Sequence, residues 1–169
     1  MTVFSIGSVA FAFIIQMFAD RYGLDWIDVS AQIKAESAFD PKAVSPVGAK
    51  GLMQIMDDTA EWLVGISGEV LFDPRTNIGI GTYYMRYLVK FWSKRGVKDY
   101  RFALASYNCG PNRVLRIWRK VKGGYGEIES RLPLETKVYV KRITRWASIW
   151  KDADNLNGED LGELSTNNT

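Results

Sequence analysis

Hydrophobic residues recur along this chain at the three- and four-residue spacing of amphipathic helices. The longest such pattern predicts a helix over residues 77–95, whose inner face is Ile78, Gly81, Met85, Leu88 and Trp92. An earlier helix is predicted from the shared face of Trp26, Val29, Ile33 and Glu36. A closing helix is predicted from Tyr139, Ile143, Trp146 and Trp150. No long alternating run argues for a large sheet, so we expect a mostly α fold with at most a minor β element.

Capping and turn residues separate these helices. The residues predicted to begin or end them are Gly23, Asp25, Asp57 or Asp58, Gly65, Gly96, Asp99 and Pro111. Asp40-Pro41 and Asp73-Pro74 mark turns, and the glycines of segment 123–126 mark a loop. With 169 residues the chain has room for one domain, which we predict to span residues 1–150.

The two ends of the chain depart from the amphipathic pattern. Residues 1–19 carry no charge, and residues 1–14 are interpreted as an apolar N-terminal extension or the start of a first helix. Because no Lys or Arg precedes the apolar run, a core helix is favoured over a signal or anchor and over a membrane-active segment. Residues 151–169 hold one basic and five acidic residues, and we predict a flexible acidic tail there.

Composition removes several kinds of chemistry. The chain has no His and a single Cys, which excludes Ser-His and Cys-His catalysis and a disulfide framework. Without His or a CxxC spacing a zinc site is not expected, so we predict no metal and no cofactor. The formal net charge is +3 although the last nineteen residues are acidic, so the body is basic and suits an anionic partner.

Glu36 lies on the apolar face of its predicted helix. Burial disfavours the charged form of a carboxyl group, so a buried Glu36 would have a raised pKa and act as a proton donor near neutral pH. The structural alternative is that Glu36, close to a helix end, turns outward or pairs with Lys34 or Lys50. Periodicity alone leaves both interpretations open.

Four motifs follow one another in an order that changes this balance. They are ESAF at 36–39, AVSPVGAKGLMQI at 43–55, ASYNCGP at 105–111 and LPLETKVYV at 132–140. This succession resembles the soluble lytic transglycosylase (SLT domain) family, whose fold is similar to goose-type lysozyme. The resemblance covers residues 15–146 and implies a single lysozyme-like helical domain.

The resemblance also implies roles for particular residues. Glu36 matches the single catalytic acid of the family. The residues that match its substrate-binding positions are Ser45, Met53, Gln54, Tyr107, Asn108 and Tyr139. Of these, Ser45 matches the serine that approaches the N-acetyl group of the muramic sugar, and Tyr139 matches the tyrosine that orients the acid.

Some of these residues also have plain structural interpretations. Met53 and Tyr107 are of the type and spacing of core residues, and Ser45 before Pro46 is a common turn start. Gln54 and Asn108 are less easily explained, because an amide in an apolar stretch needs hydrogen-bond partners that a sugar can supply.

The resemblance implies cleavage of the β-1,4 bond between N-acetylmuramic acid and N-acetylglucosamine in peptidoglycan glycan strands, without water, to leave 1,6-anhydro ends. One glutamate would act first as acid and then as base. A lysozyme-like muramidase on the same scaffold is the alternative, and it needs a second carboxylate such as Asp57 or Asp58. A basic nucleic-acid-binding module is a distant alternative, suggested by the cations of residues 113–122 around Trp118.

Location and partners are the last expectations. The target lies in the cell wall, yet no conventional export signal is visible, which favours a phage-encoded or virion-associated enzyme over a conventionally secreted one. The apolar N-terminus is a candidate attachment to a membrane or to a larger virion or secretion assembly. We expect a monomer that binds peptidoglycan and no nucleic acid.

Overall fold

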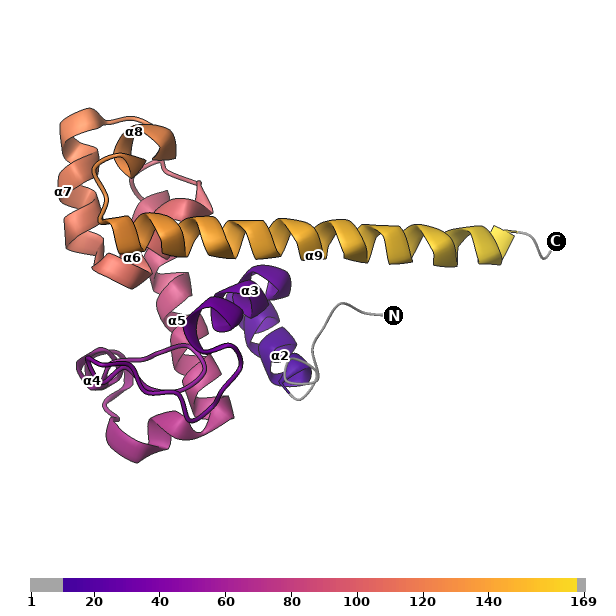
Figure 1. Cartoon of the computed structure of the whole chain (residues 1–169), viewed down its shortest axis with the longest axis horizontal. Helices are drawn as coiled ribbons and strands as arrows, with labels where there is room; N and C mark the ends of the chain where they lie inside the picture. The colour runs from indigo at the N-terminus through magenta and orange to yellow at the C-terminus, as the bar shows by residue number, and fades with distance from the viewer. Residues whose placement is uncertain (1–10, 167–169) are drawn as a thin grey trace.

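The computed structural model describes the backbone of residues 11–166 and the side chains of residues 11–155, and all named elements of this part are helical (Figure 1). They are α2 (Ala12–Tyr22), α3 (Trp26–Ser37), α4 (Asp57–Val64), the 3-10 helix η1 (Gly68–Phe72), α5 (Pro74–Ser93), α6 (Tyr100–Cys109), α7 (Pro111–Val121), α8 (Tyr125–Glu129) and α9 (Leu134–Thr166). Two isolated β-bridges, from Val44 to Lys50 and from Lys50 to Ile55, lie in the loop between α3 and α4. The predicted mostly α fold with a minor β element is confirmed.

Most helix ends fall where local sequence chemistry predicts them. Gly23 follows α2 in the left-handed conformation, with φ of 63°. The Asp25 and Asp99 carboxylates accept hydrogen bonds from the backbone at the starts of α3 and α6. Two predictions differ from the structure. The α5 helix begins at Pro74, because Asp73 caps it through the Thr76 N–H, and residues 125–129 form α8 where we expected a loop.

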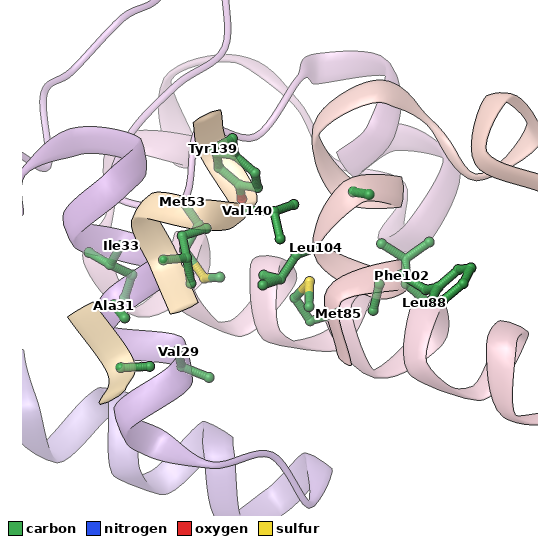
Figure 2. Close-up of a cluster of buried hydrophobic side chains, with 14 of the residues drawn as sticks. Val29, Ala31, Ile33, Met53, Met85, Leu88, Phe102, Leu104, Tyr139 and Val140 are labelled. Carbon is green, nitrogen blue, oxygen red and sulfur yellow. The ribbon is translucent and has the colours of Figure 1, made fainter. Parts of the chain in front are cut away.

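The core lies where α5 and α6 meet α3 and α9. The predicted inner face of α5 is fully buried along its length. Figure 2 shows side chains from α3, α5, α6 and α9 gathered in one cluster, together with Met53 from the loop after α3. Because α9 packs against both α3 and α6, this core fixes the C-terminal end of α3 against α9.

The end of the chain extends the predicted closing helix. Helix α9 continues without a break past residue 150 to Thr166 and runs beyond the other helices in Figure 1. Lys151, predicted to begin the tail, pairs with Asp28 at 2.7 Å and Asp25 at 2.9 Å. Charge counting could not show that the Lys151 cation meets two carboxylates of the body, and the boundary at residue 150 stays a prediction. The flexibility of the remaining acidic residues stays a prediction.

At the other end, α2 begins at Ala12, so residues 12–14 of the predicted apolar segment belong to the first helix. Residues 1–10 of that segment, like residues 167–169 of the predicted tail, lie outside the described residues. Within the described part of the chain, no helix combines the length and the hydropathy that a membrane crossing requires.

Candidate active site

Glu36 occupies the last turn of α3 and faces α9. The hydroxyl of Tyr139 donates a hydrogen bond to Glu36 Oε1 at 2.6 Å. The same hydroxyl accepts a hydrogen bond from Gln32 Nε2 at 3.1 Å. Gln32 and Glu36 are four residues apart and therefore share one face of α3. Tyr139 is 4% exposed, so its ring is fixed by the core and holds the carboxyl in one orientation.

The surroundings of Glu36 make it a weak acid. Burial raises the pKa of Glu36 from its ordinary value of 4.5 to about 7, against the opposing effects of the Tyr139 hydrogen bond and the Arg142 cation. The negative charge of Glu135 adds to the rise in this pKa. Near neutral pH both forms of Glu36 are therefore populated. The alternative pairing with Lys50 does not occur, because Lys50 pairs with Asp57.

The loop between α3 and α4 is attached to the helices on both sides of Glu36. Ser37 Oγ donates to the Leu52 carbonyl at 2.9 Å, which ties the loop to α3. The Tyr107 hydroxyl of α6 donates to the Met53 carbonyl at 2.9 Å. These two bonds hold adjacent loop residues beside the acid.

Asn77, near the start of α5, anchors the same loop. Its amide nitrogen donates to the carbonyls of Lys50 at 2.9 Å and Leu71 at 2.7 Å, and its Oδ1 accepts from the Met53 N–H at 2.7 Å. Gly51 makes this approach possible, because a Cβ there would lie 2.5 Å from Asn77 Nδ2. We predicted Asn77 only as a helix start. A buried polar residue near the start of a buried helical face is the signal that would have found it.

The side chain of Met53 lies in the core, and its predicted place in the cleft lining stays a prediction. Its side chain is 0% exposed and packs against Gly81 of α5, where an added Cβ would lie 2.3 Å from the Met53 sulfur. The backbone carbonyl of Met53, not its side chain, connects it to the site through Tyr107.

Ser45 and Gln54 are held within the loop. Ser45 Oγ accepts from the Ala49 N–H at 3.0 Å, the bond of a turn. Gln54 adopts a left-handed φ of 49°, and its amide nitrogen donates to the carbonyls of Gly51 at 2.9 Å and Ala43 at 3.2 Å. The hydrogen-bond partners expected from a sugar are thus supplied to this amide nitrogen by the loop itself.

Asn108 connects α6 to α9. Its Oδ1 accepts a hydrogen bond from Thr136 Oγ1 at 2.7 Å, and Thr136 lies one turn before Tyr139. Burial raises the pKa of the neighbouring Cys109 thiol, which stays protonated at neutral pH. The structure therefore brings Glu36, Tyr139, Tyr107 and Asn108 to the junction of α3, α6 and α9.

Asp57 and Asp58, the acids proposed to assist Glu36 in a muramidase, both lie in the first turn of α4. Asp57 accepts hydrogen bonds from Lys50 and from the Gly68 N–H, which lower the pKa of Asp57 and keep it ionised at the start of α4. Asp58 is exposed on the same helix turn. The charge of the exposed Glu135 of α9 does act on Glu36, and although Glu135 lies in the motif at 132–140, we did not predict it as a site residue.

The basic cluster of α7 suggested the distant nucleic-acid alternative. Arg113, Arg116 and Arg119 are exposed, whereas Trp118 packs edge-on against Trp92 at 5.9 Å between ring centroids. The aromatic ring is thus directed to the core and not to a nucleic-acid base. Among the described residues there is also no group of three or more His, Cys, Asp or Glu that could hold a metal ion.

The structure is thus a helical domain in which one partly buried glutamate lies against a tyrosine at the junction of α3 and α9. These features indicate the class of protein to which the chain belongs. The sequence model of the transglycosylase SLT domain matches residues 13–128, and the chain belongs to this family.

Among curated proteins, the chain is 38% identical over 129 residues to a soluble lytic murein transglycosylase of Escherichia coli K12, across 70% of this chain and 19% of the relative. It is 42% identical over 105 residues to a membrane-bound lytic murein transglycosylase F of Desulfosudis oleivorans, across 60% of this chain and 22% of the relative. The chain spans about a fifth of the length of these curated relatives.

Solved structures agree with the fold. The 70-kDa soluble lytic transglycosylase of Escherichia coli superposes with a TM-score of 0.73 and 32% identity, over 82% of this chain and 24% of that one. The complex of the 70-kDa soluble lytic transglycosylase with bulgecin A gives a TM-score of 0.76 and 30% identity, over 86% and 24%. An inactive glutamate-to-glutamine mutant of the Pseudomonas aeruginosa enzyme gives 0.74 and 28%, over 85% and 24%.

Proposed function

We propose that this chain is a lytic transglycosylase that cleaves the β-1,4 bond between N-acetylmuramic acid and N-acetylglucosamine in murein. The observation that carries the proposal is Glu36, whose pKa is raised by burial to about 7 beside the Tyr139 hydroxyl. A group with this pKa donates and accepts protons with similar ease near neutral pH. The names of the curated relatives support murein as the substrate.

The proposed reaction has two proton transfers through one carboxyl group. Glu36 first protonates the glycosidic oxygen, and the bond to the anomeric carbon breaks with positive charge developing on the muramic sugar. The ionised Glu36 then removes the proton from the 6-hydroxyl of that sugar, which attacks the anomeric carbon. The product is a 1,6-anhydro ring, Glu36 regains its proton, and no water, metal or cofactor takes part.

The substrate contacts form a finer part of the proposal. The N-acetyl group can stabilise the positive charge, and we assign its positioning to Ser45, whose turn lies in the loop beside the acid. Tyr107 and Asn108 are proposed to contact the sugar at the cleaved bond. Gln54 is proposed to bind the glycan strand from its fixed loop. Met53 is proposed to support the substrate site through its backbone carbonyl, which accepts the Tyr107 hydrogen bond. Delivery by a virion and the monomeric state stay predictions, as does the absence of nucleic-acid binding.

A muramidase is the second candidate, and the charge of Glu135 on Glu36 is the observation that favours it. In that reaction a second carboxylate activates a water molecule, so the product has an ordinary reducing end. Mass spectrometry of digested sacculi separates the two reactions, because the anhydro product is lighter by one water. Reducing ends alone would contradict the transglycosylase proposal.

The decisive experiment compares wild type with Glu36→Gln on purified sacculi. The amide is nearly isosteric with the acid but cannot protonate the leaving oxygen, so we expect turnover to fall by about 100- to 10,000-fold with the fold retained. The inactive glutamate-to-glutamine mutant of the Pseudomonas aeruginosa relative supports this expectation. Glu69→Gln, at an exposed position in η1, is the matched carboxyl-to-amide control and should keep full activity. Substantial activity in Glu36→Gln would overturn the proposal.

A further inference from the structure

Three aromatic side chains of α4 and α5 form a connected cluster, which we call the aromatic row: Trp62, Tyr84 and Tyr87. Trp62 meets Tyr87 edge-on at 5.3 Å and Tyr84 at 6.3 Å between ring centroids. Tyr84 and Tyr87 are stacked at 6.2 Å with an interplanar angle of 15°. These are favourable geometries for aromatic pairs, so the rings fix one another in place.

The outer rings of the row are exposed to an unusual degree. Trp62 is 61% exposed and Tyr87 is 38% exposed, although burying a large aromatic ring would contribute more to folding than leaving it in water. A contiguous exposed set of this kind commonly marks a binding surface. The rings of the aromatic row are therefore already ordered in the free protein, so ligand binding would not have to order them.

The row is continuous with the site at Glu36. Tyr84 contacts Tyr107 at 5.2 Å between ring centroids. The Tyr107 hydroxyl in turn donates a hydrogen bond to the Met53 carbonyl in the loop beside the acid. Exposure rises outward from the half-buried Tyr107 and Tyr84 to Tyr87 and Trp62. The rings thus lead from the bond-cleaving residue to the surface of α4 and α5.

We infer that the aromatic row binds sugar rings of the glycan strand that lie several units away from the bond cleaved at Glu36. The inference rests on the proposed function for the identity of the strand. A β-1,4-linked pyranose presents a face of C–H groups, which packs against the electron-rich face of an aromatic ring, while its hydroxyl groups stay in water. Sugars suit this surface better than a protein partner because the row joins the residues placed around the cleaved sugar.

The test measures binding of peptide-free murein glycan strands of defined lengths by titration calorimetry, with every variant carrying Glu36→Gln so that no strand is cut. We expect Trp62→Ala and Tyr87→Ala each to weaken binding of long strands by about tenfold and to leave binding of a disaccharide unchanged. Trp62→Phe, which keeps a ring, should restore part of the affinity. Tyr83→Ala is the matched control, because Tyr83 is 40% exposed on α5 and, among the described residues, its ring pairs with that of Tyr22 and with no ring of the row.

In the active enzyme the same substitutions should raise KM for long strands with little change in kcat, because the row touches only remote sugars. Loss of long-strand affinity equal to that of Tyr83→Ala would overturn the inference while leaving the proposed function intact. Absence of turnover in wild type, with row-dependent strand binding, would overturn the proposed function alone. If none of the proteins, Glu36→Gln alone included, binds strands of any length, the inference fails.

Discussion

Tyr139 sets both the position and the acidity of Glu36. Its hydroxyl donates to one carboxyl oxygen of Glu36 and accepts from Gln32, so each of the three side chains restrains the other two. A donor favours the ionised form of a carboxyl group, and this hydrogen bond offsets part of the rise in pKa that burial causes. Without it, Glu36 would be a still weaker acid.

Tyr139→Phe should therefore shift the alkaline limb of the pH–rate profile to higher pH, because the pKa of Glu36 rises above about 7. Turnover at neutral pH should fall by about 10- to 100-fold, since the carboxyl is no longer held toward the glycosidic oxygen. The measurement is kcat/KM on soluble murein between pH 5 and pH 9.

Tyr100→Phe is the control for Tyr139→Phe. It removes a buried hydroxyl that has no hydrogen-bond partner among the described residues, so the profile should stay that of wild type. A Tyr139→Phe profile that coincides with wild type would show that the hydroxyl does not tune the acid.

At the scale of elements, the loop between α3 and α4 depends on a residue from outside it. Asn77 of α5 binds Lys50, Met53 and Leu71 through three hydrogen bonds, two of them fully buried. The loop has no regular structure beyond two isolated bridges, so these contacts carry much of its definition.

Asn77→Ala should lower the free energy of unfolding by about 2–4 kcal/mol, because it leaves the Met53 N–H and the Leu71 carbonyl without this partner, whereas the Lys50 carbonyl keeps the bond from the Ile55 N–H. Activity should also fall in the folded fraction, since the loop is then less fixed beside Glu36. Urea unfolding gives the first quantity and specific activity at low temperature the second. Asn112→Ala, at an exposed position on α7, should change neither. Equal stability of the two variants would refute the anchoring role.

Sequence reasoning predicted what neighbouring residues determine and missed what distant ones determine. The caps at Gly23, Asp25 and Asp99 were predictable because each acts within a few residues of itself. Asn77 contacts loop residues more than twenty positions away, and no local pattern reports such a contact. The apolar character of Met53 was visible, but its burial beneath the loop depends on the packing of α5.

The same contrast holds for the candidate site. Glu36 was found because its face is apolar and its motif resembles a family, and the structure places Tyr139 against it. The hydrogen bonds of Gln54 inside its loop could not be predicted, because they depend on a left-handed backbone at a residue other than glycine.

At the scale of the whole molecule, Glu36 links stability to pH. Its pKa is about 7 in the folded chain, against an ordinary value of 4.5, so between these values the folded chain keeps a proton that the unfolded chain has released. The free energy of unfolding therefore falls as pH rises through this window, by about 3 kcal/mol in total.

Glu36→Gln has no group that titrates here and should escape this loss. Relative to wild type it should gain about 3 kcal/mol of stability between pH 4.5 and pH 8.5. Urea unfolding of both proteins at the two pH values tests this, because the other titrating groups cancel in the difference. A difference that does not change with pH would mean that the acid is solvated as in water.

The helix that carries Tyr139 has a practical consequence for anyone who trims this chain. The family match ends at residue 128, whereas α9 begins at Leu134. A fragment cut to the matched region would keep Glu36 but lose the Tyr139 phenol that binds it. The fragment would also lose Lys151, which pairs with Asp28 near the opposite end of α3. Expression boundaries for this chain should therefore be drawn beyond Lys151.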